Sequence, residues 1–184
     1  TPTQSTSRRQ RQMCIRDRSG IKRGDDDYFT LYVANHPFGG SGFASRLVEV
    51  IREDNGLAYS VYSYFAPLRE TGLFAMGMQT KTEQTGQALE LLDQELRKYV
   101  AEGPEKDELA ESISNITGSF PLKIDSNSKL LGYLAMIGFY ELPIDYLDHF
   151  IDNIKAVDVD RINEALKRRI HPDKMVTVVV GKQS

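Results

Sequence analysis

Arg52 and Tyr59 are the residues best suited to act together on a substrate. Arg52 falls in the last turn of a predicted helix, and Tyr59 lies seven positions later in a predicted strand, beyond a turn at Gly56. Because glycine lets a helix end in a sharp turn, the guanidinium and the phenol can reach one side of a cleft. Two donors that converge on one carbonyl oxygen would stabilise an oxyanion. The alternative is that Arg52 is a solvated helix end and Tyr59 an ordinary half-buried strand residue.

A glycine-rich segment precedes this pair and is a second candidate site. It contains Gly39, Gly40, Ser41 and Gly42. Residues 40–45 nearly match the G-x-G-x-x-G pattern of nucleotide-binding loops, but the last position is serine, and the preceding residues predict a helix rather than a strand. Nucleotide binding is therefore disfavoured. Two interpretations stay open: a flexible connection between helices, or a mobile loop that touches an extended substrate.

Metal-ligating residues are few and scattered. His36, His149 and His171 are far apart in the sequence, and neither H-E-x-x-H nor H-x-x-E-H occurs. The single cysteine, Cys14, excludes an internal disulfide framework and a thiolate-rich zinc site. We expect this chain to hold no metal or cofactor of its own.

Composition and charge limit the class of protein. With 184 residues, 40% of them hydrophobic, the chain is long enough for one domain with a core. No apolar run approaches the roughly 18 residues of a membrane span, so we expect a soluble domain. Of 23 basic and 26 acidic residues, five arginines and one aspartate fall in residues 1–18, which leaves 18 basic and 25 acidic residues elsewhere. So acidic a domain is a poor partner for nucleic acid.

Residues 1–18 lack apolar periodicity, and they predict a disordered extension that is not native to the domain. The domain itself is expected to span residues 19–184. An alternative is a basic arm that binds nucleic acid or serves in targeting, which deletion of residues 1–18 would test.

The remaining sequence predicts an α+β fold, with an antiparallel or mixed sheet packed against several helices. A helix is expected to start at the acidic residues 25–27 and to end at Pro37, and a second to end near Gly56. Period-two segments predict strands, and period-3.6 segments predict further helices. The strands are expected over residues 57–65, 73–80 and 174–180, and the further helices over residues 83–101, 104–120, 126–140, 146–154 and 158–170.

Two stretches of sequence, in this order along the chain, resemble the insulinase (pitrilysin) family. Residues 38–47 read FGGSGFASRL, and residues 51–63 read IREDNGLAYSVYS. Residues 126–140 and 175–181 are also similar to this family. The resemblance covers about residues 19–181 and is specific to the C-terminal half of processing-peptidase-like bacterial members.

This resemblance implies a function. Family members are zinc endopeptidases built from two similar α+β halves around a closed chamber, and the other half or a separate subunit carries H-x-x-E-H. Arg52 and Tyr59 match the pair that binds the substrate carbonyl, and residues 39–42 match the glycine-rich loop that touches substrate. The resemblance therefore implies a substrate-binding, zinc-free half that is inactive alone. Its partners would be a zinc-bearing half and a peptide substrate.

The same fold also serves structural proteins, so the alternative function is a non-catalytic structural or peptide-binding subunit. Retention of both Arg52 and Tyr59 favours the peptidase half, because a purely structural member would be free to lose them.

Overall fold

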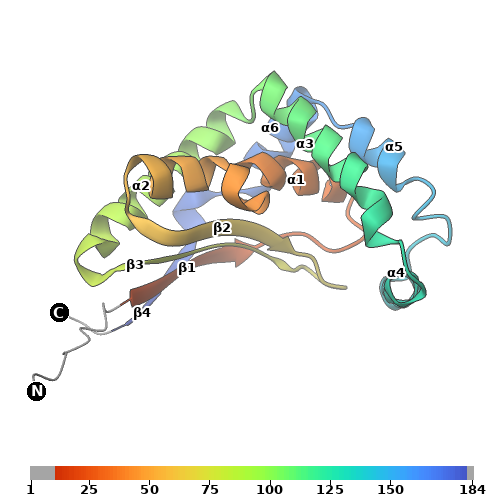
Figure 1. The fold of residues 1–184 in the computed structure, drawn as a ribbon, viewed down its shortest axis with the longest axis horizontal. Helices are drawn as coiled ribbons and strands as arrows, with labels where there is room; N and C mark the ends of the chain where they lie inside the picture. Colours follow the sequence, from red (N-terminus) through yellow and green to blue (C-terminus); the bar gives the residue numbers. More distant parts are fainter. Residues whose placement is uncertain (1–10, 182–184) are drawn as a thin grey trace, which may run out of the picture.

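The computed structural model describes residues 11–181, and in them one antiparallel sheet packs under a layer of helices (Figure 1). The sheet has four strands in the order β2-β3-β1-β4. They are β1 (Arg11–Ser19), β2 (Ala58–Ala66), β3 (Leu73–Lys81) and β4 (Val176–Val180). The α+β class and the hairpin of β2 and β3 are confirmed.

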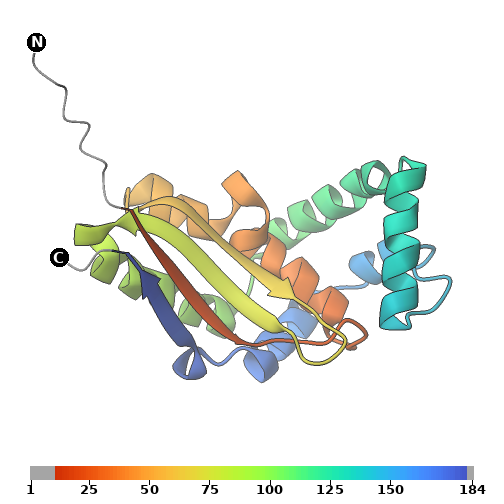
Figure 2. The same ribbon diagram turned by 90° about the horizontal axis from the view of Figure 1, so that it is seen from below.

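Besides shorter π-helical and 3-10 turns, the described part of the chain also contains six α-helices. They are α1 (Tyr28–Asn35), α2 (Thr85–Glu102), α3 (Lys106–Ser119), α4 (Asn127–Tyr140), α5 (Phe150–Lys155) and α6 (Val159–Arg169). Helix α6 packs against both α1 and α2, and these helices lie over one face of the sheet. In the view from below, no helix of residues 11–181 covers the opposite face (Figure 2). No helix in the described residues is long and apolar enough to span a membrane.

The prediction that residues 1–18 are disordered and lie outside the domain is wrong for residues 11–18. Together with Ser19 they form β1, which pairs with β3 on one side and β4 on the other. The stretch forms a strand because two neighbours satisfy its backbone groups, although its side chains lack a strand-like pattern. Cys14 adds a buried side chain. Residues 1–10 lie outside the described residues, and the non-native origin of the stretch stays a prediction.

The first helix does not end at Pro37, as the sequence predicts. It continues from α1 into a π-helical turn, His36–Gly40, in which the Ser41 amide donates to the His36 carbonyl at 2.9 Å. Tertiary packing overrides the local preference of a residue before proline. Phe38 is buried and stacks on Tyr99 with ring centroids 4.6 Å apart.

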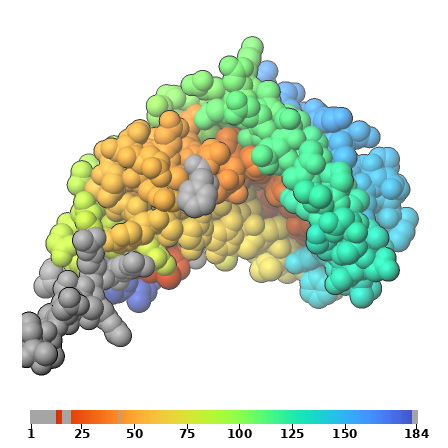
Figure 3. All heavy atoms as spheres, in the orientation of Figure 1, coloured from red at the N-terminus to blue at the C-terminus, as the bar shows by residue number. Residues whose placement is uncertain are grey.

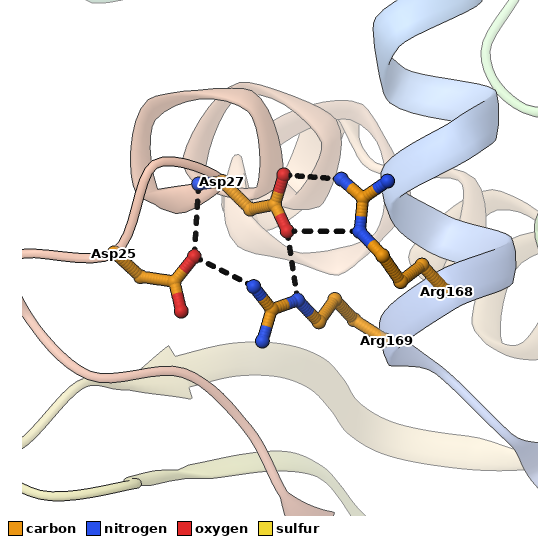
Figure 4. Close-up of polar contacts among 4 residues, drawn as sticks. All are labelled: Asp25, Asp27, Arg168 and Arg169. Carbon is orange, nitrogen blue, oxygen red and sulfur yellow. Dashed lines mark hydrogen bonds and ion pairs between the residues drawn. The ribbon is translucent and has the colours of Figure 1, made fainter.

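The acidic start of α1 has a different role from the predicted one. No side chain caps α1 at Asp27; Asp27 and Asp25 instead bind two arginines at the end of α6 (Figure 4). Asp27 accepts from Arg168 Nη2 at 2.6 Å and from Arg169 Nε at 2.7 Å, and Asp25 accepts from Arg169 Nη2 at 2.8 Å. Burial acts to raise the pKa of the Asp27 carboxyl, but the hydrogen bonds and charges of both arginines outweigh it and hold that pKa below its usual value. The cluster ties α1 to α6 across some 140 residues of sequence.

Candidate functional site

Arg52 lies in a π-helical turn, Val48–Asp54, that buries Val48 and Ile51. Its side chain is 36% exposed, and its Nε lies 3.3 Å from Glu53 Oε1. The turn ends at Gly56, whose φ of 61° favours glycine. The Gly56 amide donates to the Arg52 carbonyl at 3.0 Å, so Arg52 lies in the last helical turn and the chain leaves the helix at Gly56, as predicted.

Tyr59 lies at a bulge in β2. Ala58 pairs with Thr80 and Ser60 pairs with the next residue of β3, Gln79. Tyr59, between them, therefore has no pairing partner in β3. A bulge interrupts the alternation of a strand and re-aims the side chain that it carries. Tyr59 is half-buried, and the segment that holds Arg52 packs against β2. The fold therefore places the predicted pair on two contacting elements joined by a tight turn.

The first part of the glycine-rich segment is packed, and its glycines are required by close contacts. A Cβ on Gly39 would lie 2.3 Å from Ser63 Oγ and 2.7 Å from Ser63 N, and one on Gly40 would lie 2.6 Å from Asn35 Nδ2. Ser63 and Asn35 bond to each other, since Ser63 Oγ donates to Asn35 Oδ1 at 2.7 Å. The segment is therefore held against β2, four residues beyond Tyr59, and the prediction of a flexible connection is wrong for this part.

The second part of the segment is more open. Gly42 has a φ of 68°, and a Cβ there would meet nothing within 4 Å. Ser45 Oγ donates to the Gly42 carbonyl at 2.8 Å and fixes the turn. The buried hydroxyl of Ser41 has no hydrogen-bond partner among the described residues. This end of the segment thus combines an exposed backbone with an unused hydroxyl.

A polar cavity of about 280 Å³ lies between this segment and α3, and sequence reasoning missed it. His36 Nδ1 lies 3.1 Å from Ser112 Oγ, and Arg46 Nη2 donates to Glu108 Oε2 at 2.7 Å. Burial lowers the pKa of His36, although a hydrogen bond to Asn115 opposes the shift. No sequence signal marks the cavity, because its two walls lie about 70 residues apart in the chain. Its lining residues are His36, Pro37, Ser41, Ala44, Arg46, Glu49, Glu108, Glu111, Ser112 and Asn115.

Metal-ligating side chains do not cluster within residues 11–181. No group of three or more His, Cys, Asp or Glu side chains in this part of the chain could hold a metal ion. His149 Nε2 lies 3.2 Å from Asp145 Oδ2 on the protein surface. Burial raises the pKa of the Cys14 thiol, which makes it a poor ligand. The described residues therefore do not fit a zinc ion.

Comparison with known proteins agrees with the fold. Residues 6–116 match a family described as the peptidase M16 inactive domain. An uncharacterized zinc protease YmxG of Bacillus subtilis is 31% identical over 87% of this chain and 39% of its own length. A solved M16 inactive domain from Pseudomonas fluorescens is 33% identical, with a TM-score of 0.87 over 92% of this chain and 40% of that one.

A Helicobacter pylori protein named a non-peptidase homolog YmxG is 28% identical over 78% of this chain and 33% of its own length. The chain thus spans well under half the length of these relatives.

Proposed function

Because the chain belongs to the family of the peptidase M16 inactive domain, we propose that it is the zinc-free, substrate-binding half of a zinc metalloendopeptidase. The zinc site would belong to the other half, since the residues described in this chain do not fit a zinc ion. The chain would bind a peptide and contribute to its hydrolysis only as part of such an assembly.

Arg52 and Tyr59 would donate hydrogen bonds to the substrate carbonyl oxygen. A guanidinium is always charged and a phenol is a neutral donor, so together they can stabilise negative charge that develops on that oxygen. The observation that carries this proposal is the position of Tyr59 at a bulge of β2, directly beyond the turn that follows Arg52. Loss of one such donor lowers turnover about 100- to 1,000-fold in other enzymes.

The glycine-rich segment would contact the peptide next to this pair. Its open end offers the backbone at Gly42, while Gly39 and Gly40 hold the segment against β2. The main chain of a peptide would thus bond to the backbone of the segment whatever its own side chains are.

Reconstitution tests the proposal. The chain alone should cleave no peptide from a mixed fluorogenic library, whereas its mixture with the H-x-x-E-H polypeptide of the same organism should do so and should lose this activity with a chelator. Turnover by the isolated chain that a chelator inhibits would contradict the zinc-free assignment.

A second function is that of a non-catalytic structural or peptide-binding subunit of the same fold. It is favoured by the relative named a non-peptidase homolog. In that case the mixture would hold together without hydrolysis, and substitution of Arg52 or Tyr59 would leave the association of the two polypeptides unchanged.

A further inference from the structure

Helix α4 is apolar on both sides, but only one side is packed against the rest of the chain. On that side Tyr133 makes an edge contact with Phe120, with ring centroids 6.4 Å apart, and Ile137 is buried. Tyr140 lies at the end of the same side, and its hydroxyl donates to the Pro67 carbonyl at 3.5 Å. These contacts fix the orientation of α4 and turn its other side outward.

The outward side is a continuous apolar surface, which we call the α4 stripe. Its residues follow the i, i+3, i+4, i+7, i+8 spacing of one helix face. Leu131, Leu134 and Phe139 are 67%, 53% and 62% exposed. A Cβ added at Gly138 would meet nothing within 4 Å, so another backbone could approach there. The members of the stripe are Leu131, Leu134, Ala135, Gly138 and Phe139.

We propose that the α4 stripe is the surface through which this chain docks onto the zinc-bearing half, an inference that rests on the function proposed above. A helix that is apolar all round is normally buried, and an exposed apolar patch of this kind marks an interaction site. The matched relatives supply an occupant, since this chain accounts for only 39% of the length of the Bacillus relative. The remainder of such a protein is large enough to cover α4.

The charges around the stripe select the partner. Within residues 121–148 two lysines stand against four carboxylates; Lys129 Nζ is bonded to Asp125 Oδ1 at 2.8 Å and Arg69 pairs with Glu141, so the excess acidic charge is that of Asp145 and Asp148. This acidic rim repels an anionic bilayer, which amphipathic helices usually bind through lysine and arginine. It also disfavours a symmetric pair of stripes, because two identical acidic rims would face each other. The surface that fits is an apolar groove with basic residues beside it.

The position of α4 agrees with this role. Figure 2 shows α4 standing away from the sheet, at the end of the described molecule opposite β4. In the space-filling view α4 forms the lower end of the arched molecule, beyond the strands of the sheet (Figure 3). A partner seated on the α4 stripe would therefore lie at that end of the molecule.

The test measures association and does not depend on catalysis. We expect Leu134→Gln combined with Phe139→Gln to raise the Kd for the H-x-x-E-H polypeptide at least 30-fold by sedimentation velocity. Ala135→Glu removes no packed side chain and places a charge in the centre of the stripe, so it should have the same effect while folding normally. Val178→Gln, at a position of β4 that is 48% exposed, is the matched control and should change the Kd less than threefold.

Other outcomes overturn the proposal. It fails if the H-x-x-E-H polypeptide does not bind, or if the variants bind as tightly as the control. Stripe-dependent dimerisation of the isolated chain would assign the surface to a second copy, and stripe-dependent binding to phosphatidylglycerol vesicles would assign it to a membrane. If the mixture hydrolyses peptide but its Kd does not change with these substitutions, the docking surface alone is refuted. Stripe-dependent association without turnover would refute only the peptidase function.

Discussion

At the scale of single residues, Tyr59 and Gly39 show how far a sequence specifies a site. The spacing of Arg52 and Tyr59 and the turn at Gly56 are visible in the sequence, and the structure contains that turn. The bulge at Tyr59 is not visible, because a bulge is defined by the pairing with β3 rather than by a residue type. For the same reason the close approach of Gly39 to Ser63 could not be predicted: it depends on how two distant segments pack.

The donor role of Tyr59 predicts a large effect on turnover with little effect on folding. In the reconstituted pair, Tyr59→Phe should lower kcat at least tenfold, because it removes one donor to the oxyanion. Tyr62→Phe is the matched control, since Tyr62 lies on the same strand and is 41% exposed. Steady-state kinetics of both variants would decide the matter, and equal kcat values for the two would remove the proposed role.

Close packing at Gly39 predicts a loss of stability. Gly39→Ala should lower the free energy of unfolding by about 1–3 kcal/mol, because its Cβ would overlap Ser63. Gly132→Ala, within α4 and with nothing near its added Cβ, should instead raise that free energy by about 0.5–1 kcal/mol. Urea denaturation measures both. A Gly39→Ala variant as stable as the original chain would show that the segment can move away from β2.

At the scale of elements, periodicity identifies most helices and strands but misses β1. Helices α2, α3, α4 and α6 lie within about two residues of their predicted positions, because their apolar faces repeat every 3.6 residues. Strand β1 has no such pattern, and its place between β3 and β4 is stabilised by backbone pairing on both sides. The ion-pair cluster between α1 and α6 could not be predicted either, because a run of aspartates fits the start of a helix as well as it fits ion pairs with a distant segment.

The internal position of β1 predicts that its backbone is essential to the domain. Ile15 pairs with Gly77 of β3 and with Val178 of β4. Ile15→Pro removes a donor and cannot adopt regular pairing, so we expect a loss of at least about 3 kcal/mol in the free energy of unfolding. Ile15→Val should cost only about 0.5–1.5 kcal/mol. Thermal unfolding followed by circular dichroism compares them; identical curves would mean that β1 does not belong to the sheet.

The cluster between α1 and α6 predicts a pH dependence. The folded pKa of Asp27 lies below the unfolded value, so the stabilisation is complete above an unfolded pKa of about 3.9 and is lost as the pH falls through the folded pKa. Asp27→Asn should lower the free energy of unfolding at pH 7 by about 1–3 kcal/mol. It should also reduce the loss of stability that occurs as the pH falls. The exposed neighbour Asp26→Asn is the control. Urea titrations between pH 2 and pH 7 would refute this account if both variants followed the original chain.

At the scale of the whole molecule, the chain is a folded domain that resembles part of a larger assembly. The family resemblance seen in the sequence is confirmed, and the matched relatives are more than twice as long as the matched region. The fold carries a candidate substrate site along β2 and an uncovered apolar stripe on α4. The sequence does not predict that this stripe is exposed, because an apolar helix is normally expected to be buried.

The central claim is that this chain supplies half of a peptidase, and a titration tests it most directly. A fixed amount of the H-x-x-E-H polypeptide is mixed with increasing amounts of this chain, and the hydrolysis of a fluorogenic peptide is followed. We predict that neither polypeptide is active alone. In the mixture the rate should rise with added chain and saturate at one chain per zinc-bearing polypeptide. A rate that does not depend on this chain, or hydrolysis by this chain alone, would contradict the account.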